Sequence, residues 1–198
     1  MAETLYFFVG LIIAITIHEF SHALLADRLG DPTPRSQGRL SLNPLAHLDP
    51  LGTLMLFLVH FGWGKPVIFD PYNLAHPRRD AGIISIAGPA SNLLLAAILS
   101  LLIHFTPIPY LLMPMFYAII LLNISLAVFN LIPVYPLDGE KILAAILPRD
   151  LAYEYQAVMN RYGTIILILM VLPLFGGTSP VVSLISPVIA FLSHLLLG

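Results

Sequence analysis

The sequence predicts an all-α polytopic membrane protein, and three observations support this fold class. Hydrophobic residues make up 58% of the 198 residues and charged residues only 10%, whereas a soluble domain carries about 25% charged residues. Several apolar stretches approach the ~20 residues that a helix needs to cross a bilayer. The basic residues can all be placed on one side of those stretches. We therefore expect one integral-membrane domain over residues 1–198, a bundle of about five to six transmembrane helices.

The expected spans follow one another from the first residues. They run approximately over 5–27, 81–105, 111–134 and 162–197. An acidic residue, Glu3, stands where a signal peptide has a basic region, so we expect the first span to be retained. Pro173 and Gly177 interrupt the last stretch, which predicts a C-terminal hairpin of helices and leaves open whether it crosses twice. The apolar run 51–63 is too short to span and predicts a re-entrant or interfacial segment.

Two loop segments are expected to be extended. Residues 35–42 alternate weakly, and residues 65–69 are β-branched with Gly and Pro beside them. Non-helical backbone at membrane depth is tolerated only where it is paired or covered by protein. These segments predict a small membrane-associated β-hairpin or sheet beside the bundle.

Positive charge predicts the orientation. With the N-terminus outside and the spans alternating, the inside loops become 28–50, 64–80 and 138–161, and they contain all nine Lys and Arg residues. This is the distribution that the positive-inside rule favours. We expect a multi-pass protein with its N-terminus outside and these three loops on the cytoplasmic side.

Charge and cysteine content exclude several functions. The net charge of −2 gives no reason to expect a nucleic-acid partner. The absence of cysteine excludes disulfides, thiolate zinc sites and cysteine nucleophiles. Any metal must therefore be held by nitrogen and oxygen ligands.

The first span contains the sequence His18-Glu19-Phe20-Ser21-His22. Two histidines four residues apart on a helix share a face and can reach one metal ion, with Glu19 beside it as a general base. The pattern alone is moderately specific. Ionisable residues inside an apolar span cost ~2.5–3.5 kcal/mol each on insertion scales, so a functional site is favoured over a solvated helix face.

A catalytic zinc site needs a third protein ligand, and Asp138 is the best candidate. Pro133 and Pro136 should end the preceding helix, and Gly139 permits a tight turn, which leaves Asp138 at the inside membrane boundary. The alternative is that Asp138 only caps a helix over 139–147.

A further polar residue, Asn92, lies in Gly88-Pro89-Ala90-Ser91-Asn92 within the 81–105 span. It could be an inter-helix hydrogen-bonding residue. It could instead hold the substrate backbone or stabilise an oxyanion near the metal.

Together the HExxH, GPxxN and NxxP…DG motifs resemble the site-2 protease family of intramembrane zinc metalloproteases, peptidase family M50. Residues 41–50 and 69–73 are also similar to prokaryotic members. The resemblance implies that His18, His22 and Asp138 bind one Zn²⁺, that Glu19 activates water and that Asn92 lines the site. It covers the chain from about 10 to 145, and the expected catalytic core is about 5–145.

The family resemblance also implies an activity and partners. The implied activity is regulated intramembrane proteolysis, and the implied partner is a single-pass or membrane-tethered protein substrate. The expected β-hairpin could present this substrate by strand addition. We expect a minimal member without a PDZ or CBS domain, and leave open whether it forms a homo-oligomer. The alternatives are an intramembrane metal-ion transporter and an inactive helix-binding scaffold. The one-sided polar groups disfavour the transporter, and Glu19 disfavours the scaffold.

Overall fold

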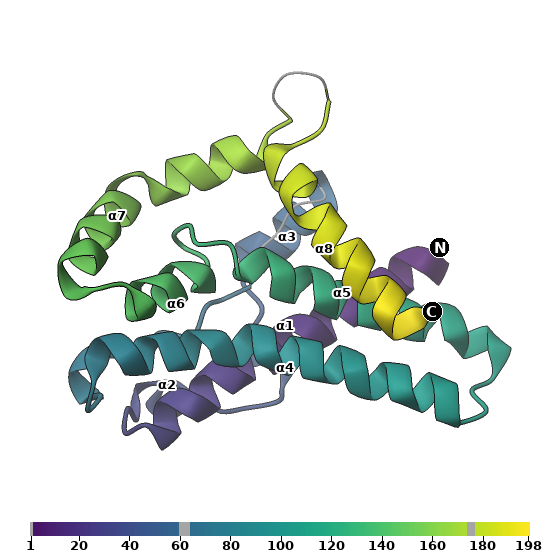
Figure 1. Cartoon of the computed structure of the whole chain (residues 1–198). Coiled ribbons are helices and arrows are strands. Elements are labelled where there is room, and N and C mark those ends of the chain that lie inside the picture. Colours follow the sequence, from purple (N-terminus) through teal and green to yellow (C-terminus); the bar gives the residue numbers. More distant parts are fainter. Residues whose placement is uncertain (1, 60–63, 174–176) are drawn as a thin grey trace.

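The computed structural model describes residues 2–59, 64–173 and 177–198, and the chain in these ranges is almost entirely helical (Figure 1). Its eight α-helices are α1 (Ala2–Arg28), α2 (Thr33–Ser36), α3 (Pro50–Val59), α4 (Pro77–Phe105), α5 (Met113–Asn130), α6 (Asp138–Ile146), α7 (Arg149–Val171) and α8 (Pro180–Leu197). Three short 3₁₀ turns cover Pro44–Ala46, Pro71–Asn73 and Tyr110–Leu112. The expected 81–105 span starts four residues earlier, at Pro77.

Four of the described helices are long and apolar enough to cross a membrane, fewer than the predicted five to six. They are α1, α4, α5 and α8. Two helices in the expected positions do not qualify as spans. α3 has only ten residues, and the first half of α7 carries charged side chains such as Arg149, Asp150 and Glu154. The stretch predicted as a hairpin over 162–197 does form two helices, but the first of them starts at Arg149.

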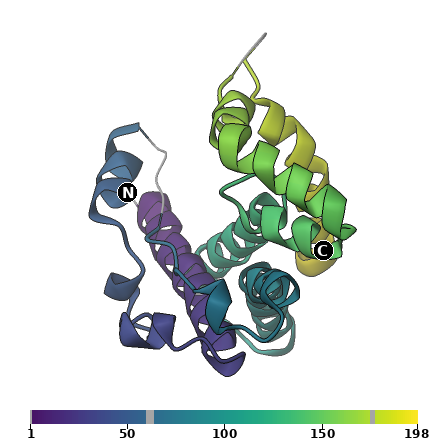
Figure 2. The ribbon, with the colours of Figure 1, turned by 90° about the vertical axis from the view of Figure 1, so that its left-hand side faces the viewer.

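The centre of the bundle is the mutual packing of α1, α4 and α5, with α6 against α4 and α8 against α5. In Figure 2 the three central helices α1, α4 and α5 lie between α3 on one side and α6 and α7 on the other. A small residue, Gly10, lets α1 and α5 approach, since an added Cβ would lie 2.8 Å from Leu122. Outward-facing residues of α4 such as Leu94, Ile98 and Leu101 are exposed. Apolar residues on both faces of a helix are typical of a membrane bundle.

The predicted β-hairpin is wrong for the residues that the structure describes. Within them the only β feature is one isolated antiparallel bridge between Leu48 and Gly64, and no strand forms. The predicted segment 35–42 begins instead with the end of α2 and a turn at Gly38, whose φ is +69°. In the second segment Pro66 has no N–H to give to a ladder.

Side chains, rather than a neighbouring strand, form hydrogen bonds with backbone groups of 64–70. Arg39 donates to the carbonyls of Lys65 and Pro66. Glu19 accepts from the Val67 N–H at 2.7 Å. These contacts, with the bond from the Lys65 N–H to the carbonyl of His47, pair backbone groups of this segment without a second strand.

Asp31, just beyond α1, holds the end of this segment through hydrogen bonds. Its buried carboxylate accepts from the Asp70 N–H at 2.7 Å, from Asn73 Nδ2 at 2.8 Å, and from the backbone and hydroxyl of Thr33. Burial alone would raise the pKa of Asp31, but these hydrogen bonds lower it below its ordinary value of 3.8. Asp31 therefore ties the end of α1 to the segment that precedes α4.

We predict that Asp31→Asn lowers the stability of the folded chain by about 1–3 kcal/mol, because an amide cannot accept from so many donors and leaves some unpaired. Thermal unfolding in neutral detergent measures the loss. Since the folded pKa of Asp31 is depressed, its contribution is complete above pH 3.8 and disappears as the pH falls through the folded pKa. Asp150→Asn, an exposed change on α7, is the control and should leave the unfolding temperature almost unchanged. Equal stability of Asp31→Asn and wild type would contradict this role.

Candidate metal centre and active site

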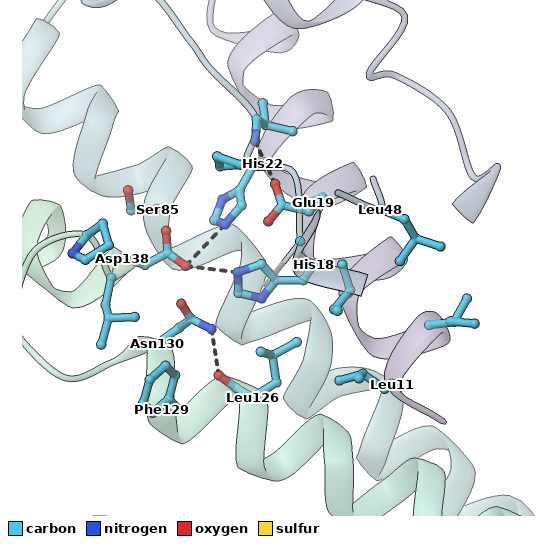
Figure 3. Close-up of a pocket in the computed structure, with 18 of the residues that line it drawn as sticks. Leu11, His18, Glu19, His22, Leu48, Ser85, Leu126, Phe129, Asn130 and Asp138 are labelled. Atoms are coloured by element: carbon cyan, nitrogen blue, oxygen red, sulfur yellow. Dashed lines mark hydrogen bonds and ion pairs between the residues drawn. The ribbon is translucent and has the colours of Figure 1, made fainter. Parts of the chain in front are cut away.

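Three predicted metal ligands converge in the structure (Figure 3). The Nε2 atoms of His18 and His22 lie 3.0 and 3.2 Å from Oδ2 of Asp138. One ligand atom from each residue lies within 4.8 Å of the other two. Both histidines are buried, with 4% and 7% of their surface exposed. Residues 120 positions apart in sequence thus form one group capable of holding a cation.

Helix α4 determines which nitrogen of each histidine faces the centre. His18 Nδ1 lies 2.6 Å from Oδ1 of Asn92, and His22 Nδ1 lies 2.7 Å from the carbonyl oxygen of Ile84. Both oxygens can only accept, so each Nδ1 carries the proton and donates it. The Nε2 lone pairs are therefore directed at the carboxylate of Asp138.

This arrangement fits a zinc ion. Two Nε2 lone pairs and a carboxylate oxygen are all electron-rich, and without a cation between them they repel one another. Two imidazoles and one carboxylate are a ligand set of catalytic zinc sites, which keep a further position open. Histidine ligands of metals generally donate their other ring N–H to a carbonyl or carboxylate, as His18 and His22 do to Asn92 and Ile84.

Asp138 reaches the histidines because the chain turns sharply after α5. The loop 131–137 contains two prolines, and α6 begins at Asp138 itself. The N-cap position of α6 is occupied by Leu137, whose side chain forms no capping hydrogen bond. Asp138 is the first helical residue, so it is not the N-cap of this helix. Gly139 packs directly on this loop, since an added Cβ would lie 2.3 Å from the carbonyl oxygen of Ile132.

Gly88 supplies the surface on which the two imidazoles rest. A Cβ at this position would lie 2.5 Å from Nε2 of His22 and 2.6 Å from Cε1 of His18. The sequence alone did not predict that Gly88 contacts the two imidazoles. The informative signal was a glycine four residues before Asn92, on the helix face that carries the partner of His18.

Asn92 is fully buried between helices rather than on the cavity wall. Its Oδ1 accepts from His18, and its amide nitrogen donates to the carbonyl of Ala14 at 3.0 Å and to Oδ1 of Asn123 at 2.7 Å. Both amide hydrogens are therefore in use, and Asn92 is not among the residues that line the cavity described below. This favours the inter-helix alternative and makes Asn92 a positioning residue for His18.

A cavity of about 570 Å³ opens beside the metal ligands. His18, Glu19, His22 and Asp138 form its polar part. The remainder is mainly apolar, and its lining includes Phe8, Leu11, Ile12, Ile15, Leu48, Leu126, Phe129 and Leu167. The cavity thus joins a polar reaction centre to an apolar chamber between α1 and α5.

The segment 64–70 forms one wall of this cavity, and sequence reasoning missed its anchors. Val67 and Phe69 line the cavity, and the Val67 N–H holds Oε2 of Glu19. Arg39, 3% exposed, donates to this segment, and the carbonyl of His47 accepts from the Lys65 N–H at 2.8 Å. These partners are distant in sequence and follow no motif.

We predict that Gly88→Ala abolishes stoichiometric zinc binding, because its methyl group occupies the space of the imidazoles. Metal content of the purified protein, measured by mass spectrometry, tests this. Ala90→Val adds volume two residues away on an exposed face and should retain the metal. Normal zinc content in Gly88→Ala would contradict the geometry.

We predict that Asn92→Ala weakens zinc affinity by about 10–100-fold, the usual effect of losing a ligand's hydrogen-bonding partner. Competition with a chelator measures the affinity. Asn130→Ala is the matched control, since Asn130 donates to the carbonyl of Leu126 on its own helix and, among the described residues, to no candidate metal ligand. If Asn92 acted on the substrate, zinc affinity would stay constant while kcat fell.

The comparisons with known proteins agree with this site. The model of "Peptidase family M50" matches residues 108–170, which include Asp138. The chain is 39% identical over 179 residues to "Putative zinc metalloprotease YwhC" of Bacillus subtilis, covering 85% of this chain and 81% of that protein. It is 34% identical over 142 residues to "Putative zinc metalloprotease Rip2" of Mycobacterium tuberculosis, covering 68% of this chain and 54% of Rip2.

The fold also has a counterpart among solved structures. The structure aligns with "Site-2 Protease from Methanocaldococcus jannaschii" at a TM-score of 0.57 and 24% identity, over 98% of this chain and 78% of that one. The identity to YwhC extends across most of both proteins, so the family resemblance expected from the motifs is confirmed. The chain belongs to the site-2 protease family of zinc metalloproteases, peptidase family M50.

Proposed function

We propose that this chain is a zinc-dependent intramembrane endopeptidase that hydrolyses peptide bonds in or near transmembrane helices of single-pass or membrane-tethered proteins. The observation that supports it most directly is the position of the His18, His22 and Asp138 group. It adjoins a largely apolar cavity, and His18 and His22 belong to α1, a helix of membrane-spanning length and hydropathy. The family membership provides the protease chemistry.

The residues divide the work of hydrolysis. His18, His22 and Asp138 would hold the zinc, which when bound supplies a Lewis acid that polarises the scissile carbonyl and acidifies water. Glu19 is held by the Val67 N–H through Oε2, which leaves Oε1 to accept a proton from water. Glu19 then passes that proton to the nitrogen of the leaving amine. Asn92 keeps His18 in the correct tautomer throughout.

The hydrogen bonding of a helix bears on the form of the substrate. A transmembrane helix keeps its carbonyls in intra-helical hydrogen bonds, so an intact helix does not present a free carbonyl to the metal group. A substrate helix must therefore open locally before cleavage, and helix-weakening residues near its scissile bond should favour cleavage.

The proposed orientation has the N-terminus outside and the metal site toward the cytoplasm. Support comes from the distribution of basic residues along the bundle. The C-terminal end of α1 and the beginnings of α4 and α7 lie toward one end of the molecule in Figure 1, and Arg28, Arg78 and Arg149 belong to these helix ends. The metal ligand His22 lies six residues from Arg28 on α1.

We predict that Glu19→Gln retains zinc but lowers cleavage by about 10²–10⁴-fold, the usual contribution of a general base. Wild type and variant are reconstituted with a single-pass substrate, and bound zinc and cleavage are measured on the same samples. Glu154→Gln, an exposed change on α7, is the control and should cleave normally.

Three other results would contradict the proposal. Cleavage by Glu19→Gln at the wild-type rate would exclude Glu19 as the base. Transfer of zinc across the liposomes by wild type would favour the transporter alternative. Zinc-loaded wild type that binds membrane helices without cleaving any of them would favour the scaffold.

A further inference from the structure

A second cavity, of about 540 Å³, lies where α4 and α7 begin, apart from the metal site. Three arginines line it, Arg78, Arg79 and Arg149, together with His76, Tyr153, Ala75 and Pro77. Of the described residues, those that line it include no carboxylate. Within the same ranges none of the three guanidinium groups forms an ion pair. The cavity therefore concentrates positive charge that the described chain does not neutralise.

One of these guanidinium groups has a buried nitrogen with nothing to bind. Nη1 of Arg78 is inaccessible and has no hydrogen-bond partner among the residues that the structure describes. A guanidinium N–H withdrawn from water and left unpaired is unfavourable, because it loses its hydration without compensation. This nitrogen is covered by protein and does not reach the cavity, so the donors available to an anion come from the exposed Arg79 and Arg149 and from the part of Arg78 that lines the cavity.

The partial charges at the beginnings of the two helices are offset by nearby carboxylates. α4 is 29 residues long and α7 is 23 residues long, and neither has a side-chain N-cap hydrogen bond. The N-terminal end of a long helix has a partial positive charge. The nearby carboxylate of Asp80 is buried, and its Oδ2 is occupied by the N–H of His76. Asp80 and Asp150 lie in the first turns of these helices and offset this partial charge, so the case for an anion rests on the three arginines.

We propose that this cavity binds a phosphate group. Guanidinium groups bind phosphate oxygens in a bidentate manner. Three guanidinium groups match the several oxygens of a phosphate monoester or diester better than the two oxygens of a carboxylate. The cavity volume leaves room for the glycerol or sugar attached to the phosphate. Tyr153, 72% exposed, and Arg79 lie at its rim, where they can contact such an attached group.

The position along the chain points to a phospholipid headgroup as the source of this phosphate. Arg78 and Arg79 immediately precede the apolar part of α4, where an inserted helix passes from the headgroup layer into hydrocarbon. Arg and Lys near the ends of membrane helices on the inner side commonly meet anionic lipids. A soluble phosphate ester has the same recognition chemistry, so the experiment must distinguish the two.

The test measures binding by the full chain in a neutral detergent. Native mass spectrometry follows retention of phosphatidylglycerol against phosphatidylcholine, and equilibrium dialysis follows inorganic phosphate. Arg78→Gln/Arg149→Gln removes two guanidinium groups, and Arg161→Gln is the control, since Arg161 lies on α7 outside the cavity and stacks on Tyr162. The double variant should bind at least about tenfold more weakly, because charge-assisted hydrogen bonds are lost, and the control should bind like wild type.

Selective retention of phosphatidylglycerol supports a lipid site, and binding of inorganic phosphate with equal loss in the double variant supports a soluble ligand. Unchanged binding in the double variant, or equal loss in Arg161→Gln, would overturn the proposal. Zinc content and elution volume report whether the double variant is folded. If it is not, Arg79→Gln and Arg149→Lys individually provide the same comparison, with a partial loss expected for each.

Discussion

The hydrogen bonds between α1 and α4 are the constraint on which the rest of the site depends. His18 donates to Asn92 and His22 to the carbonyl of Ile84, so packing two helices also selects the tautomer of two candidate metal ligands. Gly88 makes the close approach possible. Asn92 also donates to Asn123 on α5, so two side-chain amides connect the candidate metal site to the third central helix. Buried polar groups of this kind are tolerated in an apolar bundle only when every member is paired.

A second polar system holds the wall of the cavity. Arg39, His47 and Asp31 are all buried and bind the backbone of 64–70 at successive points. The same segment donates to Glu19. The carboxylate of Glu19 is thus oriented by a loop, while the candidate metal ligands His18 and His22 are oriented by contacts between helices.

Much of this arrangement could be predicted from the sequence, because hydropathy and motif spacing are local properties. The spans at α1, α4 and α5 and the meeting of His18, His22 and Asp138 belong to this class. The partner of His18 and the role of Gly88 depend on the register between two helices, which a single sequence does not contain. The predicted β-hairpin failed because side chains such as Arg39, rather than a neighbouring strand, satisfy the backbone of 64–70.

The apolar chamber has a separate consequence for how cleavage preference can diverge. Leu11 and Ile12 line it from α1, about two turns before His18, and the described hydrogen bonds between helices do not involve their side chains. Apolar exchanges that keep the total side-chain volume are tolerated best. At these positions such exchanges can change the shape of the chamber without disturbing the tautomers of His18 and His22 or the Glu19 contact. Selection for a new substrate could therefore reshape one end of the cavity while its polar end stays constant, which makes these two positions natural targets for redirecting the enzyme.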